Sequence, residues 1–148
     1  MKNLCARDVM HPRTSLPAKM AGPELIEKLS GVYPALPVVD DSLEVIGIVS
    51  EHDVLQAVKE GRTIHEFSAE SLMTCGHAEH GACGSPVSVP PDAALDDVVN
   101  LFLGNGCSLS VLPVVSKKKL IGVIARKNLM LALVEKGFWP EHEFQKRL

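Results

Sequence analysis

A stretch near the middle of the chain contains four side chains of the types that bind zinc. Cys75, His77, His80 and Cys83 lie within nine residues. Thiolate sulfur and imidazole nitrogen are the usual zinc ligands in proteins. The first two are separated by a single residue, whereas neighbouring ligands in zinc motifs are usually separated by about two to four. The stretch is therefore an atypical metal-binding candidate, and a glycine-containing loop that binds no metal is the competing interpretation.

A second stretch has the residues to bind a sugar phosphate. It reads "GIVSEHD", from Gly47 to Asp53, and it joins a β-branched run to a segment with helical spacing. Backbone amides at a helix start have no partner inside the helix, so they form a ready site for a phosphate. The carboxylate of Asp53 can accept a hydrogen bond from each hydroxyl of a ribose. Ser50 and Asp53 also have the spacing of a capping box, and the two roles are compatible because Ser50 can move from cap to phosphate.

The composition limits the function classes. The chain has 148 residues, of which 46% are hydrophobic and only 4% aromatic, so we expect an aliphatic core. The formal net charge of -3 gives no electrostatic case for binding nucleic acid or an anionic membrane. The lysine run 117–119 is expected to form a solvated turn. No signal-peptide pattern or membrane-spanning run is present, so we expect a cytoplasmic protein with reduced cysteines.

The chain repeats itself, and the repeat positions the motifs. "LPVVDDSLEVIGIVSEHDVLQAV" (36–58) is echoed by "LPVVSKKKLIGVIARKNLMLALV" (112–134), and "ARDVM" (6–10) by "AESLM" (69–73). Each copy reads as strand, helix, two strands in a hairpin, and helix. One copy alone has too little apolar surface to form a core, so the two are expected to pack together. The predicted fold class is α/β (α+β).

The expected elements follow from the same patterns. In the first half we predict strands within 14–17, 35–40 and 44–50, and helices that begin at Gly22 and at Glu51, the latter with its apolar face formed by Val54, Leu55 and Val58. In the second half we predict strands within 85–90, 110–115 and 120–125, a helix capped by Asp92, and a final helix from Arg126. The predicted organisation is residues 1–61, residues 62–137 with an inserted loop at 75–84, and a tail, 138–148, whose aromatic side chains need a surface to cover them.

These residues resemble a tandem pair of CBS domains, also called a Bateman module. The resemblance rests on "ARDVM", "LPVVDD" and "GIVSEHDVL" in the first half and on "LMT", "SVLPVV" and "GVIARKNLM" in the second. It implies two CBS repeats packed sheet to sheet with pseudo-two-fold symmetry. It also implies clefts between the repeats that bind adenosine-containing ligands, namely AMP, ADP, ATP or S-adenosylmethionine. The family motif Gly-x-x-[Ser/Thr]-x-x-Asp is matched fully by Gly47, Ser50 and Asp53.

The second copy departs from that motif. Ala125 replaces the serine and Asn128 replaces the aspartate, so the resemblance implies one functional site per chain, organised around Asp53. Arg126 and Lys127 place two cations in the first turn of a helix, where they oppose the helix dipole unless an anion lies nearby. We therefore predict that Arg126 reaches a ligand phosphate held near Ser50.

The resemblance also suggests contacts from other residues. Thr14, Ala35 and Pro37 correspond to positions near the base, and His52 lies beside the motif, where it either contacts the phosphate or is simply exposed. The predicted ligand-binding set is Ser50, His52, Asp53, Thr14, Ala35, Pro37 and Arg126. No catalytic residues are predicted, because the chain shows no nucleophile–base pair or pair of acids placed for catalysis.

The expected function is therefore a regulatory module that senses an adenosine nucleotide as a ligand rather than as a catalytic cofactor. Such a module would act through a homodimer or an unidentified regulated protein. Two alternatives remain open at this point. One is a structural dimerisation module with a vestigial site, and the other is a metal sensor that uses the loop from Cys75 to Cys83.

Overall fold

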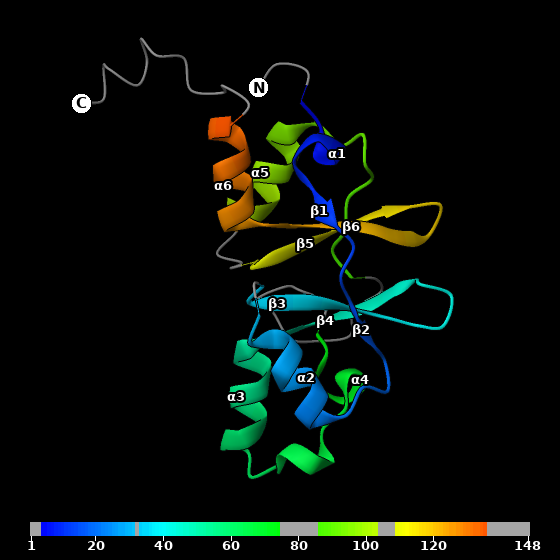
Figure 1. The fold of residues 1–148 in the computed structure, drawn as a ribbon, viewed down its shortest axis with the longest axis vertical. Coiled ribbons are helices and arrows are strands. Elements are labelled where there is room, and N and C mark those ends of the chain that lie inside the picture. Colours follow the sequence, from blue (N-terminus) through cyan, green and yellow to red (C-terminus); the bar gives the residue numbers. More distant parts are fainter. Residues whose placement is uncertain (1–3, 32, 75–85, 104–108, 136–148) are drawn as a thin grey trace, which may run out of the picture.

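Two sheets stack at the centre of the molecule, and helices cover their outer faces (Figure 1). The computed structural model describes residues 4–31, 33–74, 86–103 and 109–135. One three-stranded sheet has the order β2-β3-β4, with β2 at Leu16–Pro17, β3 at Ala35–Val39 and β4 at Val45–Ser50. The other has the order β1-β6-β5, with β1 at His11–Pro12, β5 at Val111–Ser116 and β6 at Lys119–Ala125. The predicted α+β class is confirmed.

The helices follow the repeat. The first sheet carries α2 (Gly22–Leu29), α3 (Glu51–Lys59), the short 3₁₀ helix η1 (Ile64–Glu66) and α4 (Ala69–Leu72). The second carries α1 (Ala6–Val9), α5 (Leu95–Leu103) and α6 (Arg126–Glu135). The predicted first strand of the second half is reduced to a parallel bridge between Val89 and Val114. Within the described segments, no helix has the length and apolar character needed to cross a membrane.

The two hairpins have matching registers, and each places a helix start at one end. In the β3–β4 pair, Ala35 lies opposite Ser50, and in the β5–β6 pair, Val111 lies opposite Ala125. The residue after each of these strand ends begins α3 or α6. The second hairpin turns at Lys117 and Lys118, which are exposed as predicted and have positive φ angles of 52° and 68°.

Each repeat is completed by the segment that leads into the other. Although α1 and β1 come first in the chain, they pack on the second half, where His11 pairs with Val123. Reciprocally, α4 packs on α3, and Thr74 exchanges two backbone hydrogen bonds of 2.8 Å with Ile48 of β4. The chain therefore crosses between the halves twice, which holds them together beyond the contact of their sheets.

This crossing explains the one helix start that was predicted wrongly. Asp92 was expected to cap the helix, but it lies in a turn, and α5 begins at Leu95. The Leu95 amide donates to the carbonyl of Leu4 at 3.1 Å, and Ala94 forms a bridge with Cys5. The N-terminal segment thus satisfies backbone groups that a side-chain cap would otherwise serve.

The glycines of the repeat lie where the lead-in segments cross the sheets. A Cβ atom at Gly47 would lie 2.6 Å from the sulfur of Met73. At Gly122, it would lie 2.6 Å from the sulfur of Met10 and 2.8 Å from the carbonyl oxygen of His11. The echo of "ARDVM" by "AESLM" therefore reflects one structural contact that is made twice, a methionine lying over a strand glycine.

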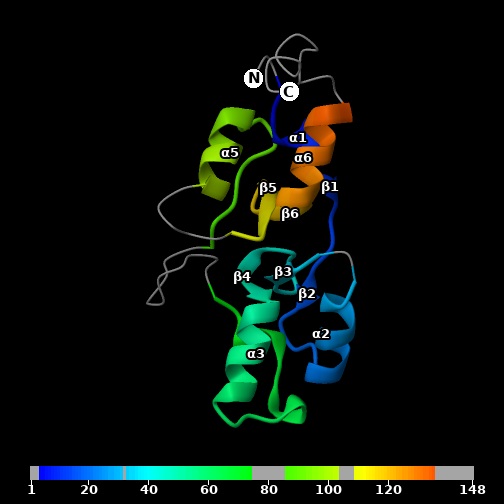
Figure 2. The ribbon, with the colours of Figure 1, turned by 90° about the vertical axis from the view of Figure 1, so that its left-hand side faces the viewer.

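Three mainly aliphatic clusters form the core. Two lie within the halves, between each sheet and its helices. The third joins the stacked sheets, which face each other in Figure 2, and contains Ala35, Val39, Ile48, Val111, Leu120 and Val123. Burying each of the larger side chains contributes about 1.5–3 kcal/mol, so this cluster favours a fixed arrangement of the halves. The aliphatic core expected from the composition is confirmed.

The outward faces of α3 and α6 carry exposed apolar side chains among polar ones. The predicted inward face of α3 is only partly correct, because Ala57 is buried and Val54 half-buried while Leu55 is 68% exposed. On α6, Met130 and Val134 are each 61% exposed. Amphipathic spacing identifies the helix but does not show which apolar residues meet the core. Both helices lie on the left-hand side of Figure 1.

Candidate functional site

The first turn of α3 is held by a complete capping box. One carboxylate oxygen of Asp53, Oδ2, accepts from the Ser50 amide at 2.8 Å and from the Ser50 hydroxyl at 3.0 Å. The Asp53 amide donates back to the Ser50 hydroxyl oxygen at 3.2 Å. The capping interpretation of this motif is therefore confirmed. Within the described chain the other oxygen, Oδ1, makes no hydrogen bond, so it remains able to accept.

A hollow of about 460 Å³ opens beside this turn, between α3 and the α4 segment. Its volume lies within the range of about 300–1,000 Å³ that small-molecule sites usually have. It is lined by His52, Asp53, Gln56, Ala57, Glu60, Arg62, Ser71, Leu72 and Thr74. The hollow brings together two predicted residues, His52 and Asp53. The other lining residues were not predicted. For Thr74 the repeat offered one sequence signal, because Thr74 follows Met73 in the second copy as His11 follows Met10 in the first.

The end of the hollow away from Asp53 is formed by Arg62, whose guanidinium is held in place by its neighbours. The Arg62 guanidinium donates to the Ser71 hydroxyl at 3.2 Å and lies 5.4 Å from the centre of the Phe67 ring. The Arg62 amide donates to the Ala57 carbonyl at 3.1 Å, just past the end of α3. Phe67 is buried, so the ring is a fixed platform for the cation.

Two of the predicted base contacts, Ala35 and Pro37, lie on the same sheet and the third, Thr14, lies outside its strands, and none of the three lines the hollow. Ala35 is buried between the sheets, opposite Ser50, and Pro37 is buried in β3. Thr14 is half-buried in the connection from β1 to β2. The Glu51 amide donates to the Pro34 carbonyl at 3.1 Å, which ties the start of α3 to the start of β3.

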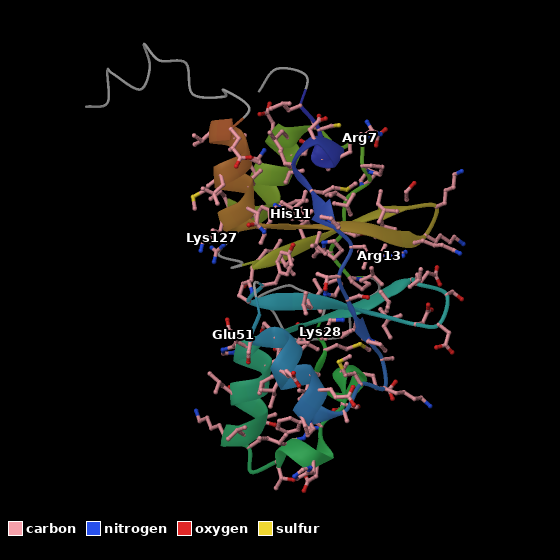
Figure 3. The ribbon with its side chains drawn as sticks, in the orientation of Figure 1. Arg7, His11, Arg13, Lys28, Glu51 and Lys127 are labelled. Carbon is pink, nitrogen blue, oxygen red and sulfur yellow. The ribbon has the colours of Figure 1, made fainter. Side chains whose placement is uncertain are left out.

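The start of α6 faces the start of α3 across the boundary between the halves, as both views show (Figures 1 and 2). Arg126 is exposed and leads α6, and Figure 3 shows Lys127 on the same side of the molecule as Glu51 of α3. Helix starts carry partial positive charge, so two of them facing each other beside Arg126 and Lys127 attract an anion. Glu51 and Asp53, both in the first turn of α3, oppose that charge.

The predicted metal candidates Cys75, His77, His80 and Cys83 lie outside the described residues, as do Cys107 and the tail 138–148. Among the residues that the structure does describe, no group of three or more histidine, cysteine or acidic side chains is placed to hold a metal ion. Cys5 is a free thiol that donates to Asp8 at 3.3 Å.

Two similar repeats, each completed by the lead-in segment of the other, define a paired α+β module. The chain belongs to the CBS domain family, which matches residues 6–60 and 83–135.

Solved structures of paired CBS proteins share this fold. CBSX2 in complex with AMP is 26% identical, with a TM-score of 0.69 over 90% of this chain and 98% of that chain. CBSX2 from Arabidopsis thaliana is 25% identical, with a TM-score of 0.71 over 93% and 99%. A putative acetoin utilization protein, AcuB, from Vibrio cholerae is 22% identical, with a TM-score of 0.71 over 94% and 96%.

Proposed function

We propose that the chain is a regulatory module that binds an adenosine-containing ligand (AMP, ADP, ATP or S-adenosylmethionine) through Asp53. The observation that carries this proposal is the Asp53 carboxylate, which lines a ligand-sized hollow at a helix start and has an oxygen that can still accept. A ribose diol supplies two donors for such a carboxylate. The AMP complex of CBSX2, a similar structure, supports the same class of ligand. The module binds and transmits, and it catalyses no reaction.

The remaining predicted residues of the first half are assigned to the phosphate and the base of the ligand. Ser50 and His52 lie at the start of α3, where a phosphate is favoured by the helix amides. The base would lie near Ala35 and Pro37 of β3 and near Thr14 in the connection from β1 to β2. Isothermal titration with AMP, ADP, ATP and S-adenosylmethionine tests the proposal, and binding of at least one is expected. If none binds, the chain is instead a structural pairing module with a vestigial site.

Replacing Arg126 with alanine tests the phosphate contact across the two helix starts. We expect a loss of about tenfold or more in AMP affinity, because a hydrogen bond between charged groups contributes about 1.5–3 kcal/mol. Adenosine affinity should stay unchanged, since adenosine has no phosphate. Lys118→Ala, in the exposed hairpin turn, is the control. Equal losses for both ligands, or no loss for AMP, would show that Arg126 does not contact phosphate.

We also propose that two copies pair through α3 and α6, since Leu55, Met130, Leu131 and Val134 present apolar surface on these helices. The helix that contacts the ligand at its start would then also form the interface between copies, which provides a route for regulation.

Leu55→Glu and Leu131→Glu should each convert the dimer to a monomer, because an unpaired carboxylate in an apolar interface costs several kcal/mol. We expect the dissociation constant to rise by about 100-fold or more, as measured by light scattering over a concentration series. Ile64→Glu, an exposed apolar position on η1, is the matched control. A wild-type chain that is monomeric at all concentrations contradicts the pairing.

A further inference from the structure

The turns of the two hairpins carry opposite charges. The β3–β4 turn contains Asp40, Asp41 and Glu44, and the β5–β6 turn contains the lysine run 117–119. Asp40 is half-buried, and its Oδ1 accepts from the amides of Ser42 and Glu44 at 2.8 and 3.0 Å, so this carboxylate holds the turn. The other charged side chains of both turns are exposed. Within the described chain, no ion pair joins one turn to the other.

Both turns lie at one edge of the module. They project to the right in Figure 1, on the side opposite to α3 and α6, with the basic turn above the acidic one. The Leu120 amide donates to the Leu43 carbonyl at 3.0 Å, which fixes the start of β6 against the acidic turn. Leu43 is itself half-buried against the cluster that joins the sheets. The edge therefore presents an acidic and a basic patch side by side in a fixed arrangement.

The backbone of these turns is strained. Among the residues that the structure describes, the non-glycine positions with positive φ are Leu43, Lys117 and Lys118, and all three belong to the two turns. A two-residue hairpin turn with positive φ at both positions usually has asparagine and glycine there. Two adjacent lysines instead raise the conformational energy and repel each other. Strain of this kind at an exposed turn favours a role for the side chains themselves.

We infer that two copies of the chain also pair edge to edge through these turns, with the acidic turn of each copy against the basic turn of the other. A two-fold axis that reverses the direction of the long axis brings both pairs of turns into contact at once. A copy that runs in the same direction would place lysines against lysines, so the charges select one orientation. This contact goes beyond the proposed function, because it needs no ligand and uses neither α3 nor α6.

The pairing is expected to be weak and sensitive to salt. Exposed ion pairs contribute little individually, and salt screens them. We expect the dissociation constant to rise by at least about tenfold between about 0.02 M and about 0.5 M salt. Since α3 and α6 lie at the opposite edge, both contacts can form in one assembly, and the turns would then join dimers to one another.

Reversing the charge of one turn at a time tests this pairing in the full chain. Asp41→Lys with Glu44→Lys gives both turns a net positive charge, and Lys117→Glu with Lys119→Glu gives both a net negative charge. We expect each variant alone to pair at least about tenfold more weakly, because both contacts then repel. An equimolar mixture of the two should pair like the wild-type turns, since opposite charges meet again. Sedimentation velocity over a concentration series measures the pairing. Every chain carries Leu131→Glu, so that α6 does not contribute.

Glu24→Lys with Glu27→Lys is the matched control. These exposed residues of α2 have the same spacing as Asp41 and Glu44 and give the same change in net charge. The control should pair like a chain with unchanged turns. Three results overturn the inference: no association at low salt, association that both charge-reversed variants retain, or a mixture of the two that stays monomeric. Such a result leaves nucleotide binding and the pairing through α3 and α6 untouched, because neither uses these turns.

Discussion

Replacing Asp53 with asparagine is expected to lower the affinity for adenosine by about 100-fold or more. The carboxylate would accept from both ribose hydroxyls, and each hydrogen bond to a charged group contributes about 1.5–3 kcal/mol. Asparagine keeps the shape and one acceptor oxygen but has no charge and turns a donor toward the second hydroxyl. The second copy of the motif already has asparagine at this position, Asn128, so the variant makes the first copy resemble the second. Isothermal titration with adenosine measures the loss.

In this variant, the effect of a lost ribose contact must be distinguished from the effect of a lost capping box. Weakening the contacts between Asp53 and Ser50 is expected to lower the free energy of unfolding by only about 1 kcal/mol, so the protein stays folded during the titration. Asp97→Asn, in the first turn of α5, is the matched control and should bind adenosine like the wild type. An Asp53→Asn protein that binds adenosine as tightly as the wild type would exclude the carboxylate as the ribose contact.

The elements that local sequence determines were predictable. The hairpins and the helices that follow them are encoded by β-branched runs, turn residues and helical spacing within about 25 residues, and the structure places them close to the expected bounds. The internal repeat then required two similar halves. The crossing of α1 and α4 to the opposite halves was not predicted, because four-residue helices carry little periodic signal and their partners are distant in sequence.

The candidate site, too, could be predicted only where it depends on local sequence. Ser50 and Asp53 are three residues apart, so the capping geometry follows from local spacing. The hollow does not, since it exists only where α4 and Thr74 meet α3. Arg62 belongs to a segment without motif character, and only the folded chain places its guanidinium between Phe67 and Ser71. Long-range packing therefore supplies one wall of the hollow, which local spacing does not predict.

Replacing Gly47 or Gly122 with alanine should destabilise the fold by about 1–3 kcal/mol each, because a methyl group has no space beneath the crossing segments. At Gly47 the new Cβ would meet the Met73 side chain, including its Cβ at 2.7 Å, so adding Met73→Ala should not restore stability. At Gly122 it would meet the His11 carbonyl at 2.8 Å, which no substitution at Met10 removes. Urea unfolding of the single and double variants measures these effects.

Gly31→Ala is the control for these substitutions, because its nearest neighbour is the Lys28 carbonyl at 3.3 Å and it lies outside the sheets. Its free energy of unfolding should change by less than that of either strand variant. The Gly47→Ala variant should also bind adenosine more weakly, since moving Met73 displaces Thr74 from the wall of the hollow. If Gly47→Ala were as stable as Gly31→Ala, the lead-in segment would not lie against β4 in solution, and the hollow beside Asp53 would lose one of its two walls.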